Sequence, residues 1–139
     1  MKQYKTIDHT ADIGVEAWGT TKQEAMEAVV EAMFDLMAAG DSVVPRQEKK
    51  VVAVGTDDAD RMINLLREAL YFFHGERWIG KTCRIPEMKE TQVTAYLQGE
   101  PYDPQRHVLK MEIKAATYHQ LKLEPSQDRG WYARVIFDV

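Results

Sequence analysis

The run Ile13-Gly14-Val15-Glu16-Ala17-Trp18 decides how the amino-terminal part of this chain folds. Its odd-numbered residues are apolar and alternate with glycine, a carboxylate and an indole, which is the two-residue period of a strand with one buried face. The segment just before it, from Asp8 to Gly14, is rich in side chains that hydrogen-bond to their own backbone. We therefore expect a loop that leads directly into a strand.

The loop also concentrates groups that could carry chemistry. Asp8, His9 and Asp12 offer oxygen and nitrogen ligands to a divalent metal ion, or a general base. The simpler interpretation is that the aspartates and Thr10 only cap a turn before the strand. The residues of this loop alone leave both interpretations open.

Length and composition limit the class of protein. The chain has 139 residues, of which 45% are hydrophobic and 29% charged, as expected for one globular domain. A net charge of -4 gives no basic field for direct binding of nucleic acid or an anionic membrane. No apolar run approaches the roughly 20 residues of a membrane span, the start lacks a signal-peptide core, and Cys83 is the single cysteine. We expect a cytoplasmic protein.

Two helices are predicted. Thr21 and Glu24 form a capping box for a helix that Gly40 ends, with a methionine-rich apolar stripe that indicates core rather than an adaptable binding groove. A second helix runs to His74-Gly75-Glu76, and three aspartates lie in its first turn. Their spacing resembles a calcium loop, but the glycine and the distal glutamate of such a loop are missing. Helix capping is therefore the better interpretation.

The other regular segments are expected to be strands. They are Lys49 to Val54, Ile79 to Ile85 paired with Gln92 to Leu97, a long alternating strand that starts at His107, and a last strand from Trp131 to Val139. We predict an α+β fold, a single two-layer domain with two helices packed on a largely antiparallel β-sheet.

The last strand delivers a second acidic group. Asp138 stands beside Val139, where the sequence stops, so that a side-chain carboxylate and an α-carboxylate are one residue apart. Burying two such groups together is costly unless a cation or hydrogen-bond donors compensate them. A hard divalent ion with Asp12 as a further ligand would do so, and a solvated chain end is the alternative.

The segments at the two ends resemble a known family. Asp8-His9-Thr10-Ala11-Asp12-Ile13-Gly14-Val15, the run from Ile113 to His119, and Ala133-Arg134-Val135-Ile136-Phe137-Asp138-Val139 look like the signature segments of the archease family. The resemblance spans the chain, although the middle is less specific. It implies one archease-like domain over residues 1–139.

This resemblance implies an accessory protein and not an enzyme. Archeases assist the GTP-dependent RNA-splicing ligase RtcB by promoting its guanylylation and its multiple turnover. The resemblance therefore implies that RNA is contacted by the ligase and only indirectly by this chain. The family binds a divalent ion, calcium in crystals, with magnesium or manganese as other candidates. Carried over by position, the metal ligands would be Asp12, Asp138 and the terminal carboxylate of Val139. His9, Lys114 and His119 would contact the partner or orient a ligand.

Three other functions remain as alternatives. The first is a chaperone or modulator of tRNA-modifying enzymes such as tRNA methyltransferases. The second is a small metal-dependent hydrolase that uses His9, Asp12 and Asp138. The third is a domain that a metal merely stabilises.

The second helix departs from the family, because it ends Tyr71-Phe72-Phe73-His74-Gly75 where relatives tend to be more acidic.

Overall fold

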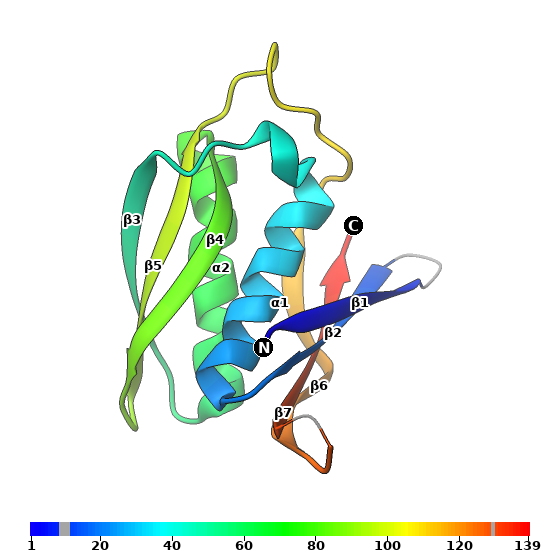
Figure 1. Cartoon of the computed structure of the whole chain (residues 1–139), viewed down its shortest axis with the longest axis vertical. Coiled ribbons are helices and arrows are strands. Elements are labelled where there is room, and N and C mark those ends of the chain that lie inside the picture. The colour runs from blue at the N-terminus through cyan, green and yellow to red at the C-terminus, as the bar shows by residue number, and fades with distance from the viewer. Residues whose placement is uncertain (9–11, 129) are drawn as a thin grey trace.

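The computed structural model describes residues 1–8, 12–128 and 130–139. Within these residues the chain forms two α-helices, seven strands and one 3-10 turn, in the order shown in Figure 1. Their bounds are β1 Gln3–Asp8, β2 Asp12–Gly19, α1 Lys22–Met37, the 3-10 turn Gly40–Ser42, β3 Gln47–Val54, α2 Asp58–Glu76, β4 Trp78–Met88, β5 Gln92–Pro101, β6 Ala115–Ser126 and β7 Gly130–Asp138.

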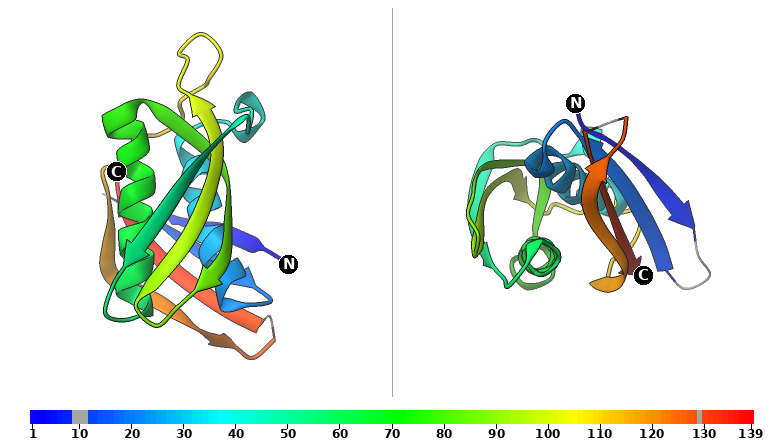
Figure 2. Two further views of the ribbon diagram at one scale, coloured as in Figure 1. Left: turned by 90° about the vertical axis from the view of Figure 1, so that its left-hand side faces the viewer. Right: turned by 90° about the horizontal axis from the view of Figure 1, so that it is seen from below.

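The strands form two antiparallel sheets, and the helices lie between them. One sheet has the order β1-β2-β7-β6 and the other β3-β5-β4. Figures 1 and 2 show α1 and α2 enclosed by the two sheets, with the inner faces of both sheets turned towards the helices. The predicted α+β class with antiparallel sheet is confirmed. The sheet is divided in two, so that the apolar stripe of each helix is covered from two sides.

The prediction of a loop before β2 missed strand β1. β1 pairs with β2 along its whole length, from Gln3 opposite Trp18 to Asp8 opposite Ile13, and strand structure resumes at Asp12. An edge strand buries little, and β1 is exposed over residues 3–6. Its sequence therefore carries almost none of the hydrophobic alternation that makes β2 recognisable.

Helix α1 begins as predicted and ends earlier. The Thr21 side chain accepts a hydrogen bond from the Glu24 N–H at 3.1 Å, which confirms the N-cap. The helix ends at Met37 and not at Gly40, because residues beyond it bind another segment. Ala39 N–H donates to the Val108 carbonyl at 3.0 Å, and Lys110 N–H donates to the Met37 carbonyl at 2.9 Å.

The same hydrogen bonds explain why the strand predicted from His107 is wrong. Residues 107–114 form no strand apart from an isolated bridge between Leu109 and Ala38, and β6 starts only at Ala115. The alternating sequence resembles a strand, but its backbone groups satisfy the open carboxyl-terminal end of α1 instead of a neighbouring strand. The segment is extended and irregular.

Helix α2 confirms the capping interpretation of its acidic first turn. The Asp57 side chain accepts from the Asp60 N–H at 2.8 Å, and Asp58 pairs with Arg61 at 2.6 Å and with Lys22 at 2.9 Å. The predicted apolar face is buried, from Ile63 to Phe73. Neither described helix is long and apolar enough to cross a membrane.

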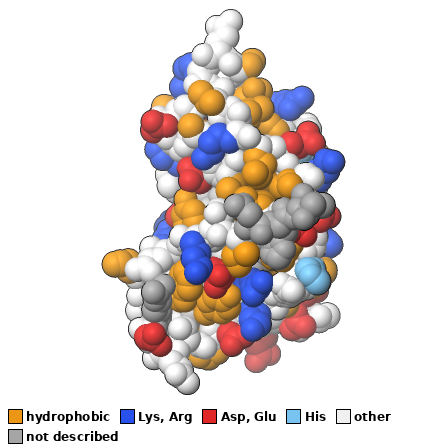
Figure 3. Space-filling view, turned by 90° about the vertical axis from the view of Figure 1, so that its right-hand side faces the viewer, with side chains coloured by type: hydrophobic (Ala, Val, Ile, Leu, Met, Phe, Trp, Pro, Cys, Tyr) orange, Lys and Arg blue, Asp and Glu red, His pale blue; other side chains and the backbone are white. Residues whose placement is uncertain are grey.

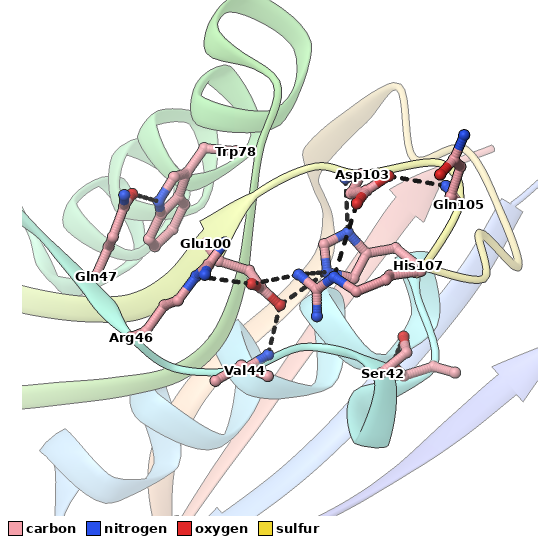
Figure 4. A network of polar contacts seen from close by, with 11 residues as sticks. Ser42, Val44, Arg46, Gln47, Trp78, Glu100, Asp103, Gln105 and His107 are labelled. Atoms are coloured by element: carbon pink, nitrogen blue, oxygen red, sulfur yellow. Dashed lines mark hydrogen bonds and ion pairs between the residues drawn. The ribbon is translucent and has the colours of Figure 1, made fainter.

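A buried polar cluster fixes the loop that follows β5. The Glu100 side chain is fully buried and accepts hydrogen bonds from Val44 N–H at 2.7 Å, from His107 Nε2 at 2.8 Å and from Arg106 at 2.5 Å, with Arg46 Nε at 3.0 Å (Figure 4). We call these five residues the Glu100 cluster. Burial favours the neutral carboxyl, but the hydrogen bonds outweigh it and lower the pKa of Glu100 to about 2.

The histidine of this cluster has a defined protonation pattern. His107 Nδ1 accepts a hydrogen bond from the Asp103 N–H at 2.8 Å, so its proton lies on Nε2, which points to Glu100. A residue that the sequence places at the start of a strand is thus drawn inwards by a carboxylate of β5. This contact is the second reason why the chain cannot form a strand at His107.

Candidate acidic site

Strand pairing brings together the two aspartates that the sequence singles out. Asp12 is the first residue of β2, Asp138 is the last of β7, and the register places them directly opposite each other. Side chains opposite each other on antiparallel strands have Cβ atoms about 4.5–5.5 Å apart. The two carboxylates, 126 positions apart in sequence, therefore share one edge of the sheet, with Asp12 half-buried and Asp138 exposed.

A third strand completes this edge. Ala115, the first residue of β6, pairs with Asp138 from the other side, and Lys114 N–H donates to the Asp138 carbonyl at 2.8 Å. Lys114 is exposed and next to this contact. Val139 follows directly and is 37% exposed. The structure thus brings Asp12, Asp138, Val139 and Lys114 to one place, which we call the acidic edge.

The other two candidate residues are placed differently. His119 also lies on β6, but four residues beyond Ala115, a separation of about 13 Å along a strand. A register shift between Thr117 and Lys122 interrupts the pairing with β7 there, and Gln120 has a φ of 53°. His119 is therefore on the same strand but not at the acidic edge. His9 lies outside the described residues.

A small apolar floor supports the carboxylates. Asp12 and Asp138 project from the outer face of the sheet, and the next residue pair on that face is Gly14 opposite Ile136. A Cβ atom on Gly14 would lie 2.9 Å from Ile136 Cδ1 and 3.1 Å from Ile7 Cβ. Ile136 is only 1% exposed although it faces away from the helices. The missing side chain of Gly14 lets Ile136 pack across β2 onto β1.

The rest of this face mixes apolar and charged groups. Tyr132 donates to Glu16 at 2.9 Å and packs its ring 5.6 Å from Trp18, and Arg134 donates to Gln120 at 2.7 Å. Burial, with the bond to Glu16, raises the pKa of Tyr132 to about 12, so the hydroxyl stays protonated. Figure 3 shows hydrophobic side chains among both signs of charge on the side of the molecule that carries β1.

The donor set of the acidic edge suits a hard cation. Carboxylate oxygens are the ligands that calcium, magnesium and manganese prefer. Among the described residues, no group of three histidine, cysteine, aspartate or glutamate side chains is arranged to hold a metal. Asp12 and Asp138 supply two carboxylates, and the predicted third donor, the main-chain carboxylate of Val139, is not a side chain. The residues present fit an ion held at an exposed edge with open coordination positions.

Two other reactive groups have no catalytic setting. Cys83 is buried, and burial raises the pKa of its thiol well above the usual value, which keeps it protonated. The acidic first turn of α2 is satisfied by its own cap and by Lys22 and Arg61. Within the described part of the chain, the acidic edge is the arrangement that brings together residues singled out in the sequence.

One residue that contacts the segment next to the acidic edge gave no signal in the sequence. His74, in the last turn of α2, points its Nε2 at the Ile113 carbonyl at 2.9 Å, next to Lys114. The sequence places it only at a helix end, because a contact between α2 and the segment before β6 arises from tertiary packing. No pattern within either segment would have revealed it.

Comparisons with known proteins agree over the whole chain. Residues 4–139 match the model of the Archease protein family (MTH1598/TM1083). The protein archease of Pyrococcus abyssi is 32% identical over 142 residues and that of Methanosarcina acetivorans is 34% identical, with at least 97% of either chain covered. A solution structure of protein 1598 from Methanobacterium thermoautotrophicum is 28% identical with a TM-score of 0.81, and covers 98% of each chain. A crystal structure of an archease from Thermotoga maritima, described as a possible chaperone, shares the fold at 22% identity and a TM-score of 0.65, with 99% of this chain and 98% of that chain covered.

Proposed function

The chain belongs to the archease family, and we propose that it activates a GTP-dependent RNA ligase of the RtcB type through a divalent cation held at the acidic edge. The observation that carries this proposal is the register of Asp12 opposite Asp138. Like charges directly opposite each other on two strands are destabilising. A chain that places them there gains most when a cation, supplied by solution or shared with a partner, lies between them.

The residues of the edge have separate roles in this proposal. Asp12 and Asp138 would bind the ion from two neighbouring strands, with the terminal carboxylate of Val139 as third donor. Lys114, exposed beside them, would meet an anionic group of the ligase or its nucleotide. The bound ion would supply charge stabilisation for phosphate groups at the guanylylation centre of the ligase. RNA would be contacted by the ligase and not by this acidic chain.

An accessory role fits the chemistry of the described residues better than independent catalysis. Cys83 is buried and protonated, and Tyr132 stays protonated far above neutral pH. The acidic edge lies on an exposed sheet end, where water is not excluded from a reacting group. A site of this kind is suited to completion by a partner protein.

The test is multiple-turnover ligation by a cognate RtcB-type ligase with GTP and metal. We expect wild-type protein to stimulate turnover, and Asp12→Asn and Asp138→Asn to lose that stimulation while remaining folded. Asp41→Asn, in the exposed 3-10 turn, is the matched control and should stimulate as wild type does. Wild-type protein that leaves turnover of a confirmed cognate ligase unchanged would exclude the proposal.

A chaperone role is the second candidate, because the Thermotoga maritima archease is described as a possible chaperone. It predicts that this protein protects a tRNA-modifying enzyme from aggregation whether or not Asp12 and Asp138 are intact. Light scattering of a heated methyltransferase, with wild-type protein and with Asp138→Asn, separates the two functions. Equal protection by both, together with no effect on ligation, would favour the chaperone role.

A further inference from the structure

One peptide group, between Ile113 and Lys114, is held at both of its polar atoms by two different elements. Its carbonyl lies 2.9 Å from His74 Nε2 on α2, and its N–H donates to the Asp138 carbonyl of β7 at 2.8 Å. A carbonyl only accepts, so Nε2 of His74 carries the proton. Because the peptide group is planar and rigid, it links the end of α2 to the end of β7.

The position of this peptide explains why the link matters. Ile113 is fully buried, and residues 107–114 belong to no sheet, so the pairing of β6 with β7 starts one residue later, at Ala115. Asp138 is the last residue of its strand, where pairing frays most easily. The peptide next to Lys114 therefore supplies the outermost hydrogen bond that β7 receives from this side.

The histidine itself is held by aromatic neighbours. Its ring packs edge-on against Phe73 at 5.5 Å, and Phe73 packs against Tyr102 at 5.6 Å. His74 lies in the last turn of α2. A carboxylate there could not donate to a carbonyl, whereas an imidazole can.

We propose that His74 is a positioning residue for the acidic edge. It acts through the peptide before Lys114 on the backbone of Asp138, and so fixes the Asp138 carboxylate opposite Asp12. This role rests on the proposed function, because the benefit of a fixed pair of carboxylates is the binding of the cation. His74 contacts neither the cation nor the ligase in this proposal.

Three variants of α2 test the link. His74→Ala removes the donor, His74→Gln keeps an N–H donor at similar reach, and Glu76→Ala is the matched control because it removes an exposed residue of the same helix end that pairs with Lys49. Hydrogen exchange of the Lys114 amide measures how firmly its hydrogen bond to the Asp138 carbonyl is held. Calcium titration by calorimetry measures the cation affinity of the acidic edge. Circular dichroism and the exchange of amides in β5 confirm that the fold is intact.

We expect Lys114 exchange to be about threefold to tenfold faster in His74→Ala, with calcium bound more weakly by a similar factor, as loss of one hydrogen bond predicts. His74→Gln should restore most of the exchange protection and most of the calcium affinity. Glu76→Ala should match wild type in both measurements. If His74→Ala changes neither the exchange rate of the Lys114 amide nor the calcium affinity, the proposed role of His74 is wrong, while the proposed cation site still stands. A wild-type chain that binds no calcium would overturn the cation site, and with it this role.

Discussion

The Glu100 cluster and the acidic edge differ in what surrounds their carboxylates. Glu100 is fully buried, and a backbone N–H, a histidine and two arginines converge on it. At the acidic edge two carboxylates face each other on neighbouring strands. Among the described residues, the Asp138 carboxylate makes no hydrogen bond or ion pair of its own. The Glu100 carboxylate is therefore balanced by its neighbours, whereas the Asp138 carboxylate is exposed next to a second carboxylate.

This difference distinguishes a structural carboxylate, Glu100, from the carboxylates that we propose to be functional. A buried charge that is matched by its own neighbours contributes to a single folded arrangement, since removing it leaves the partner charges uncompensated. Like charges opposite each other on two strands are unfavourable, and a ligand that binds only the folded state would stabilise it. Substitutions in the two sites should therefore change stability in opposite directions.

The largest effect is expected from Glu100→Ala. His107 Nε2 and the Val44 N–H would lose their acceptor, and two partly exposed arginines would lose their carboxylate partner. Each donor left without a partner costs about 1–3 kcal/mol of unfolding free energy. Urea unfolding followed by circular dichroism measures the loss. Glu68→Ala, an exposed position on α2, is the control and should stay within about 0.5 kcal/mol of wild type. Similar small losses in both variants would refute the structural role of Glu100.

The Glu100 carboxylate should also make the free energy of unfolding depend on pH. The folded state lowers the pKa of Glu100 to about 2, below its usual value near 4.3, so the folded chain binds fewer protons than the unfolded chain between these values. The stabilisation is present above about pH 5 and is lost as pH falls towards 2. The stability gap between wild type and Glu100→Gln should therefore narrow over this range in urea unfolding. A constant gap from pH 7 to pH 2 would contradict this.

The elements that could be predicted are those whose sequence period reflects their own burial. β2 and β7 alternate because one face meets the helices, and the stripes of α1 and α2 are buried on both sides. β1 was missed because an exposed edge strand has no such period. Residues 107–114 were predicted wrongly because their alternation is real, while their hydrogen bonds go to Met37 and Ala39 of another element.

The candidate site shows the same division. Asp12 and Asp138 lie in the end motifs that carry the family resemblance, and the strand register that joins them follows from the pairing of β2 with β7. His74 and Ile136 make their contacts with segments distant in the sequence, so neither contact has a local signal. The position of His119 could not be predicted, because a register shift inside β6 is decided by the partner strand and by one residue with a positive φ.

A smaller loss is expected when the floor of the acidic edge is disturbed. In Gly14→Ala the new Cβ would lie 2.9 Å from Ile136 Cδ1 and 3.1 Å from Ile7 Cβ. Ile136 is only 1% exposed and has little room to turn away, so we expect a cost of about 1–3 kcal/mol. Calcium affinity should fall with it, because the floor joins the two strands that carry Asp12 and Asp138. Gly40→Ala is the control, since the atom it would meet at 3.0 Å is the end of the Asp35 side chain. Lost stability with unchanged calcium affinity would show that the floor does not position the carboxylates.

The smallest effect has the opposite sign and is the sharpest test of the comparison. Asp138→Asn removes one of two opposed charges, so the calcium-free chain should become more stable by about 0.2–1 kcal/mol. Calcium at 100 times its dissociation constant should stabilise wild type by about 2.7 kcal/mol and leave the variant almost unchanged. Thermal unfolding with and without calcium measures both. A variant that is less stable than wild type without calcium would mean that Asp138, like Glu100, is balanced within the chain, and the distinction between the two sites would fall.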